Sequence, residues 1–221
     1  NLSPVERKKK LEKLEANVIE WILFFFSEFA KYPFTKFHKK AIKRITTNME
    51  WYEVLSWSRE LAKSTIVFMC MMYLVLTGKK KNVLLISNSH ENAVRLLEPY
   101  KKAFESNSML KAYYGDLREF GSWTADEFTL TTGATFRAIG ALESPRGTRK
   151  DAVRPDTALV DDFDTDADCR NPDILKKKWE WFEEALFPTR SISEDLLVIF
   201  CGNLIALDCC VKRAGDKADH W

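Results

Sequence analysis

The spacing of hydrophobic and polar residues changes near residue 50. Before that point the chain predicts a helix over residues 4–30, in which Ser3 and Glu6 form a capping box ahead of an apolar second half. Tyr32-Pro33 breaks this pattern, and a second, basic helix is expected over residues 35–48. We therefore expect residues 1–48 to form an N-terminal helical extension.

After residue 48, short β-rich apolar runs alternate with helical stretches. Strands are expected at Glu53–Trp57, Val83–Ser87, Phe128–Thr131, Thr135–Ile139, Ala158–Val160 and Leu196–Phe200. Helices are expected at 63–77, 89–106 and 173–186, and Thr131-Thr132-Gly133 is typical of a hairpin turn. This alternation predicts that residues 49–221 form an α/β core with a mostly parallel central sheet flanked by helices.

Composition excludes a disordered or fibrous chain, because 46% of the 221 residues are hydrophobic and 30% are charged. The net charge is only +2, so any contact with nucleic acid has to come from a local patch. Residues 1–50 carry 11 Lys or Arg against 6 Asp or Glu, a local excess of +5. Such an excess ordinarily marks a solvated helix face.

The cysteines, at positions 70, 169, 201, 209 and 210, do not form a CxxC pair and are odd in number. This usage argues against a disulfide framework or a zinc site and favours a reducing compartment. The longest apolar run, Ile66 to Leu76, is too short for a membrane span. No charged-then-apolar leader opens the chain, so we expect neither a signal peptide nor secretion.

The strongest chemical signal is the segment from Trp57 to Thr65, which follows an expected strand and precedes an apolar helix. A phosphate-binding P-loop needs this context, because the amides at a helix N-terminus attract phosphate. Lys63 would reach the β- and γ-phosphates, and the Ser64 hydroxyl would bind Mg²⁺. Trp57 and Ala62 stand where glycines are expected, so a basic helix start with a capping serine is the alternative.

A second signal is the apolar strand that ends in Asp161 and Asp162. Carboxylates at the carboxyl end of a strand lie where open α/β sheets bind ligands. Asp161 could hold Mg²⁺ and Asp162 could orient an attacking water. The alternative is an acidic helix N-terminus, which is favourable in itself.

A third signal is Asn203, which follows the strand Leu196–Phe200 through Cys201-Gly202. A polar residue at this place can sense a γ-phosphate, and the alternative is an ordinary turn at a strand end.

Together these motifs resemble the N-terminal ATPase region of the large subunit of tailed-bacteriophage terminases, from about Pro33 to Asn203. The segment 58–65 is similar to the deviant Walker A loop of that family, and Asp161-Asp162 is similar to its Walker B motif. Residues 196–203 resemble its coupling motif. The resemblance implies a P-loop ASCE-type (RecA-like) ATPase fold with an N-terminal helical extension.

The resemblance also implies site residues. Arg59, Lys63, Asp162 and Asn203 match catalytic positions, and Ser64 and Asp161 match the metal-binding positions. The positions that match the nucleotide-binding loop are Ser58, Arg59, Glu60, Leu61, Ala62, Lys63, Ser64 and Thr65.

Other positions are less firmly matched. Asp162 stands where many relatives have Glu, so Asp164 is a second candidate for positioning the water. Arg146 and Arg149 could act on a neighbouring subunit's phosphates or contact DNA, or they could be ordinary surface arginines. The segment Tyr32 to His38 lies where the family holds adenine.

The implied activity is ATP hydrolysis with Mg²⁺ that drives double-stranded DNA into a prohead in the host cytoplasm. The implied partners are DNA, the portal protein, the small terminase subunit and further copies in a ring, with no membrane. The chain ends at Trp221, so we expect the nuclease domain of the family to be absent. The alternatives are another P-loop DNA translocase or helicase-like ATPase, and a non-hydrolysing DNA- or portal-binding module with a decayed P-loop.

Overall fold

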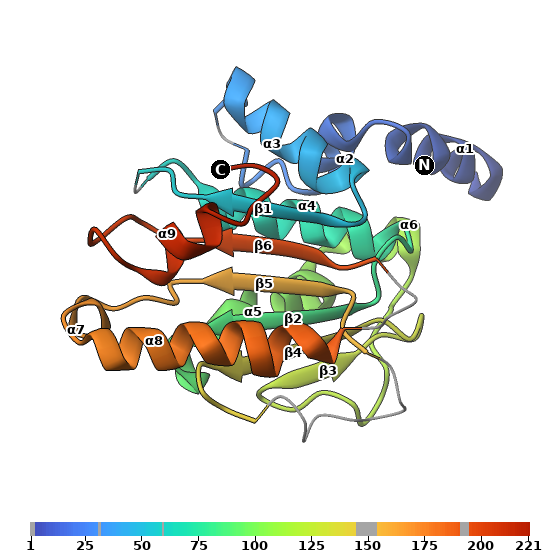
Figure 1. The fold of residues 1–221 in the computed structure, drawn as a ribbon. Coiled ribbons are helices and arrows are strands. Elements are labelled where there is room, and N and C mark those ends of the chain that lie inside the picture. Colours follow the sequence, from blue (N-terminus) through green and yellow to red (C-terminus); the bar gives the residue numbers. More distant parts are fainter. Residues whose placement is uncertain (1–2, 31, 59, 145–153, 191–194) are drawn as a thin grey trace.

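The computed structural model describes residues 3–30, 32–58, 60–144, 154–190 and 195–221 (Figure 1). The α-helices are α1 (Pro4–Glu15), α2 (Val18–Phe25), α3 (Lys36–Thr47), α4 (Lys63–Leu76), α5 (His90–Ser106), α6 (Ser108–Tyr114), α7 (Asp166–Cys169), α8 (Pro172–Glu180) and α9 (Cys210–Gly215). The strands are β1 (Trp51–Leu55), β2 (Asn82–Ser87), β3 (Glu127–Thr129), β4 (Thr135–Gly140), β5 (Thr157–Asp161) and β6 (Leu197–Cys201).

The strands form one six-stranded sheet in the order β1-β6-β5-β2-β4-β3. Every neighbouring pair is parallel except β3 and β4, which form an antiparallel hairpin. Gly133 in the hairpin turn has a φ of 82°, a left-handed conformation that glycine adopts without strain. The expected mostly parallel sheet flanked by helices is confirmed.

Helices cover both faces of the sheet (Figure 1). Successive strand residues point to opposite faces, so Leu85 and Leu159 belong to one hydrophobic cluster and Leu84 and Ala158 to the other. The first cluster includes buried side chains of α1 to α6, and the second includes those of α8 and α9. The apolar side chains of the N-terminal helices thus share a core with α4 and the sheet. The expected domain boundary at residue 48 stays a prediction.

Helix α4 is apolar on all sides and is buried from Ile66 to Val75. A helix of this composition needs apolar partners all around it, and here the sheet lies on one side and α2 and α3 on the other. Its N-terminus is therefore held in a fixed place beside β1.

Three strands end at the same level. Leu55 in β1 pairs with Cys201 in β6, and Cys201 pairs with Asp161 in β5. The chain segments that follow these residues therefore leave the sheet side by side, at what we call the carboxyl edge of the sheet.

Several expected boundaries are wrong. The helix expected over 4–30 is interrupted after Glu15, because the Asn17 side chain accepts hydrogen bonds from the amides of Ile19 and Glu20 and starts α2. The first strand begins at Trp51 rather than Glu53, since its pairing with β6 begins there.

The last expected helix, 173–186, also ends differently from the expectation. Helix α8 stops at Glu180, and the chain continues as a π-helical segment, Trp181–Leu186, and a 3₁₀ turn, Phe187–Thr189. Helices α6, α7 and α9 were not expected from the sequence; each spans only 4 to 7 residues, too few to show a helical period.

The five cysteines carry free thiols, as the sequence predicts. No helix in the described part of the chain has the length and apolar character to cross a bilayer.

A buried ion pair joins α3 to β1. The Arg44 guanidinium donates from Nη2, at 2.5 Å, and from Nε, at 3.0 and 3.1 Å to the two oxygens, to the fully buried Glu53 carboxylate. The Trp51 indole Nε1–H also donates to this carboxylate, at 2.7 Å. Removing one partner of such a pair leaves an uncompensated buried charge, which destabilises a fold more than the intact pair stabilises it.

We expect Arg44→Ala to lower the free energy of unfolding by about 3 kcal/mol, because Glu53 would remain buried without its arginine, and the His220 ring, 3.4 Å from Oε1, would be its remaining basic neighbour. Lys43→Ala is the matched control: it removes a neighbouring exposed cation of the same helix and should change stability by about 0.5 kcal/mol or less. Urea denaturation measures both. Equal stability of the two variants would contradict a structural role for the Arg44–Glu53 pair.

Candidate functional site

The loop between β1 and α4, residues 56–62, lies at the carboxyl edge of the sheet. Glu60 has a φ of 70° and Ala62 a φ of 58°, both in the left-handed region that glycine adopts most readily. This conformation explains why a glycine is expected at position 62. No capping side chain accepts a hydrogen bond from the first amides of α4, which lie at the end of the loop.

Lys63 connects the β1–α4 loop to the end of β6. Its ammonium group donates a hydrogen bond to the Trp57 carbonyl and another, of 2.8 Å, to Oδ1 of Asn203. The lysine head group thus contacts its own loop and a residue 140 positions further along the chain.

Ser64 and Asp161 meet at the same edge. The Ser64 hydroxyl donates a 2.5 Å hydrogen bond to Oδ2 of Asp161. Burial raises the pKa of the Asp161 carboxyl to about 6, and the charge of Asp162 acts in the same direction. The hydrogen bond from Ser64 and the charge of Lys63 oppose this rise in pKa.

The two candidates for the water-positioning acid lie in different surroundings. Asp162 is exposed, has a φ of 46°, and donates its amide to Oδ1 of Asp161 at 3.0 Å. Asp164 instead accepts the Val211 amide at 3.0 Å and so caps the start of α9. Asp162 is therefore the acid whose carboxylate is open to solvent beside Asp161.

An aromatic cluster joins α3 to the β1–α4 loop. The Trp57 ring lies 4.9 Å from the Phe37 ring and 5.5 Å from the His38 ring, measured between centroids. His38 Nδ1 accepts a hydrogen bond from the Thr35 amide, so the ring proton is on Nε2. This Nε2–H donates to the Leu61 carbonyl at 3.2 Å. The segment that the resemblance assigns to adenine thus contacts the loop at Trp57 and Leu61.

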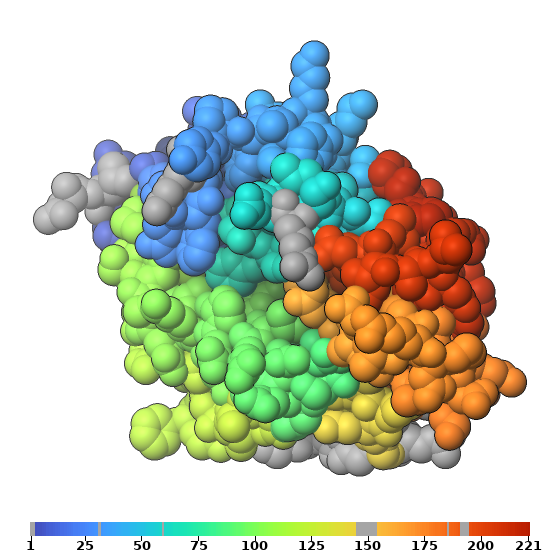
Figure 2. Space-filling model, turned by 90° about the vertical axis from the view of Figure 1, so that its left-hand side faces the viewer, coloured from blue at the N-terminus to red at the C-terminus, as the bar shows by residue number. Residues whose placement is uncertain are grey.

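The carboxyl edge of the sheet faces the viewer in Figure 2. The cyan segment with the β1–α4 loop lies near the centre, the red segment after β6 lies beside it, and the orange segment after β5 lies below. The light-blue segment with α3 lies directly above the loop. The three motifs and the aromatic cluster therefore share one face of the molecule.

The C-terminal residue also reaches this loop. The indole Nε1–H of Trp221 donates a 2.8 Å hydrogen bond to the Ser56 hydroxyl, and the Val54 amide donates to the His220 carbonyl at 2.9 Å. Sequence reasoning missed both this contact and the one between His38 and Leu61. Neither carries a spacing signal, because each joins segments that meet only in the folded chain.

The structure brings four of the expected site residues into direct contact: Lys63 with Asn203, and Ser64 with Asp161. Arg59, Arg146 and Arg149 lie outside the described residues.

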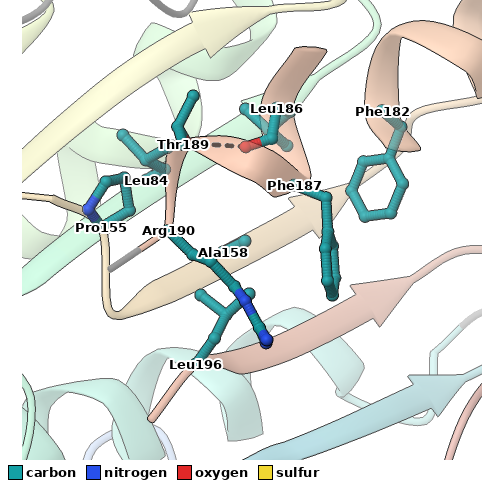
Figure 3. Close-up of a pocket in the computed structure, with 9 residues that line it drawn as sticks. All are labelled: Leu84, Pro155, Ala158, Phe182, Leu186, Phe187, Thr189, Arg190 and Leu196. Atoms are coloured by element: carbon teal, nitrogen blue, oxygen red, sulfur yellow. Dashed lines mark hydrogen bonds between the residues drawn. The ribbon is translucent and has the colours of Figure 1, made fainter. Parts of the chain in front are cut away.

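A small cavity lies away from this site, near the amino ends of β2, β5 and β6 (Figure 3). Its volume is about 10 Å³, room for about one water molecule. Its lining is mostly apolar: Leu84, Pro155, Ala158, Phe182, Leu186, Phe187, Thr189, Arg190 and Leu196. The cavity is too small and too apolar to hold a nucleotide.

The fold is similar to that of the HK97 bacteriophage large terminase, with a TM-score of 0.57 at 15% sequence identity. The similarity covers 85% of this chain and 37% of that terminase chain, so this chain spans well under half of its length. No protein-family model matches the sequence, and the comparison with curated proteins gives no match. The likeness therefore supports a terminase-like fold.

We expect the carboxyl of Asp161 to titrate with a pKa near 6, so that it is mostly protonated at pH 5 and ionised at pH 7. Ser64→Ala should raise this pKa further, because it removes a hydrogen bond that favours the charged form. Carbon-13 NMR of aspartate-labelled protein measures it, with Asp161→Asn to assign the signal. Thr65→Ala, which leaves the Ser64–Asp161 bond in place, should not move the pKa; an equal shift in both variants would contradict the assignment.

Proposed function

We propose that this chain is the ATPase motor domain of a viral terminase large subunit, with a P-loop ASCE-type fold. It hydrolyses ATP to drive translocation of double-stranded DNA into a prohead. The observation that carries the proposal is the pair of contacts Lys63–Asn203 and Ser64–Asp161 at the uncapped start of α4. The terminase-like fold supports it.

The triphosphate would bind at the N-terminus of α4. The helix dipole and the amides of the first turn attract anions, and Lys63 adds a full positive charge at the same point. To reach a phosphate, the Lys63 ammonium would exchange its hydrogen bond to the Trp57 carbonyl for one to the nucleotide. Asn203 would remain beside the lysine and contact the terminal phosphate.

The residues present fit a Mg²⁺ ion bound mostly through the nucleotide. Mg²⁺ prefers oxygen ligands, and the hydroxyl of Ser64 and the carboxylate of Asp161 lie 2.5 Å apart. The described residues hold no cluster of three or more His, Cys, Asp or Glu side chains, so phosphates and water would supply the other ligands. When bound, the ion neutralises charge on the phosphates.

Asp162 would position the attacking water, since its carboxylate is exposed next to Asp161. Asp164 is less suited to this role, because its carboxylate caps α9. The family resemblance gives Arg59 a γ-phosphate contact, and it gives Arg146 and Arg149 a contact with DNA or a neighbouring subunit.

Backbone strain favours an active site over a decayed P-loop. Four described non-glycine residues have a positive φ, and three of them, Glu60, Ala62 and Asp162, belong to the two motifs. Each such residue costs of order 1 kcal/mol or more, and strain of this kind collects at functional sites. The concentration of strained residues in these two motifs therefore supports an active site at this edge of the sheet.

The proposed partners are duplex DNA, the portal protein, the small terminase subunit and further copies in a ring. The proposed place of action is the host cytoplasm.

Lys63→Ala should lower the rate of ATP hydrolysis by about 100-fold or more, because it removes the cation that faces the transferred phosphoryl group. The fold should remain, since the lysine head group lies at the edge of the sheet and not in its core. Phosphate release measures the rate, and circular dichroism checks the fold. Lys9→Ala, an exposed lysine on α1, should hydrolyse ATP at the parent's rate. Full activity of a folded Lys63→Ala variant would refute the proposed function.

Asp162→Asn should keep nucleotide binding and lower turnover by about 100-fold or more, because it removes the base that orients water. Asp164→Asn should keep turnover and lower the melting temperature instead, since it weakens the cap of α9. Nucleotide binding, turnover and thermal melts of both variants separate the two roles. If Asp164→Asn loses turnover and Asp162→Asn keeps it, the water-positioning role belongs to Asp164.

A further inference from the structure

One face of α3 carries positive charge without compensation. Its exposed residues Lys36, Lys39, Lys40 and Lys43 lie within an arc of about 100° around the helix axis. We call this set the lysine face. None of the four forms an ion pair or hydrogen bond with a carboxylate in the part of the chain that the structure describes. The sequence holds no acidic residue between Glu28 and Glu50.

Another lysine-rich helix, α1, differs in this respect. Its exposed residues Lys8, Lys9 and Lys13 stand in a helix that also contains Glu6, Glu12 and Glu15. Carboxylates within one or two turns offset the field of the lysines. The lysine face of α3 has no such carboxylates beside it, so we expect it to attract anions more strongly than α1 does.

We propose that the lysine face of α3 binds the sugar–phosphate backbone of duplex DNA. Lys36 and Lys43 are separated by about 10 Å along the helix axis, the length over which one DNA strand presents about three phosphates. The choice of DNA as the polyanion rests on the proposed function, whereas the location of the surface rests on the charges alone.

The surroundings of α3 favour nucleic acid over a membrane surface. An amphipathic helix that binds a membrane needs an exposed apolar face to insert. Ala41, Ile42 and Ile45 of α3 are fully buried in the core, and the one partly exposed apolar side chain of the helix, Phe37, packs against the Trp57 ring. Lysines on a rigid, packed helix therefore offer an electrostatic contact only, as in binding to phosphates without sequence preference.

The position of α3 places this surface next to the nucleotide site. His38 of the same helix donates to the Leu61 carbonyl, and Phe37 contacts the Trp57 ring. Figure 2 shows α3 directly above the β1–α4 loop. DNA held on the lysine face would thus lie close to the loop that the proposed function assigns to ATP.

The test measures the affinity of the protein for a fluorescein-labelled 30-base-pair duplex by anisotropy at several salt concentrations. The variant Lys39→Glu/Lys40→Glu/Lys43→Glu, which leaves the segment from Tyr32 to His38 unchanged, should bind at least about 10-fold more weakly than the parent. The slope of log affinity against log salt should become shallower by about 3, because three phosphate contacts are lost. The control Lys8→Glu/Lys9→Glu/Lys13→Glu makes the same change in net charge on α1 and should keep most of the affinity and the slope.

Three results would overturn the inference: unchanged affinity of the folded α3 variant, equal losses in both variants, or tighter binding of the parent to phosphatidylserine vesicles than to the duplex. ATP hydrolysis without DNA should be the same in the α3 variant and the parent, because none of these lysines belongs to the nucleotide site. An inactive parent that still binds DNA through α3 would therefore refute the proposed function alone. Normal hydrolysis with unchanged DNA binding would refute the inference alone.

Discussion

The backbone hydrogen bonds that pair β1, β6 and β5 in parallel hold the candidate site together. They set Leu55, Cys201 and Asp161 at one level, so the segments that carry Lys63, Asn203 and Asp162 leave the sheet side by side. Residues 97 and 140 positions apart in the chain thereby come within hydrogen-bonding distance. Neighbouring parallel strands end at a common edge, and ligand sites of open α/β sheets lie there for this reason. A shift of register by one residue would separate these side chains and move each residue of the strand to the opposite face of the sheet.

Helix α4 complements this pairing from one face of the sheet. Its residues from Ile66 to Val75 are all buried, so every side of the helix packs against protein. The sheet and the N-terminal helices therefore fix its position. The amide groups of its first turn therefore point to one place at the carboxyl edge. The Arg44–Glu53 pair and the contacts of His38 and Phe37 attach α3 to the same region. The N-terminal helices thus support both the core and the β1–α4 loop.

The sequence was sufficient for the features that depend on local pattern. Alternating apolar runs predicted the parallel sheet. A lysine–serine pair before an apolar helix and acids after a strand singled out Ser64 and Asp161, which the structure brings into contact. Helix boundaries were less predictable, because a single capping side chain such as Asn17 outweighs a continuous helical pattern. The contacts of His38 with Leu61 and of Trp221 with Ser56 could not be predicted, since they depend on how distant segments pack. The different surroundings of Asp162 and Asp164 likewise depend on α9, a helix too short to show a period.

Alanine at position 62 has a consequence for how the unfolded chain behaves. A glycine there would adopt the left-handed backbone without strain, but it would also give the unfolded chain more conformations to lose on folding. Alanine accepts strain at a φ of 58° and narrows that ensemble. The loop therefore reaches its folded shape with a smaller loss of backbone entropy. At a positive φ the strain on alanine exceeds this gain in entropy, so the loop holds its conformation at a net cost in stability that the packing of the buried helix α4 has to offset.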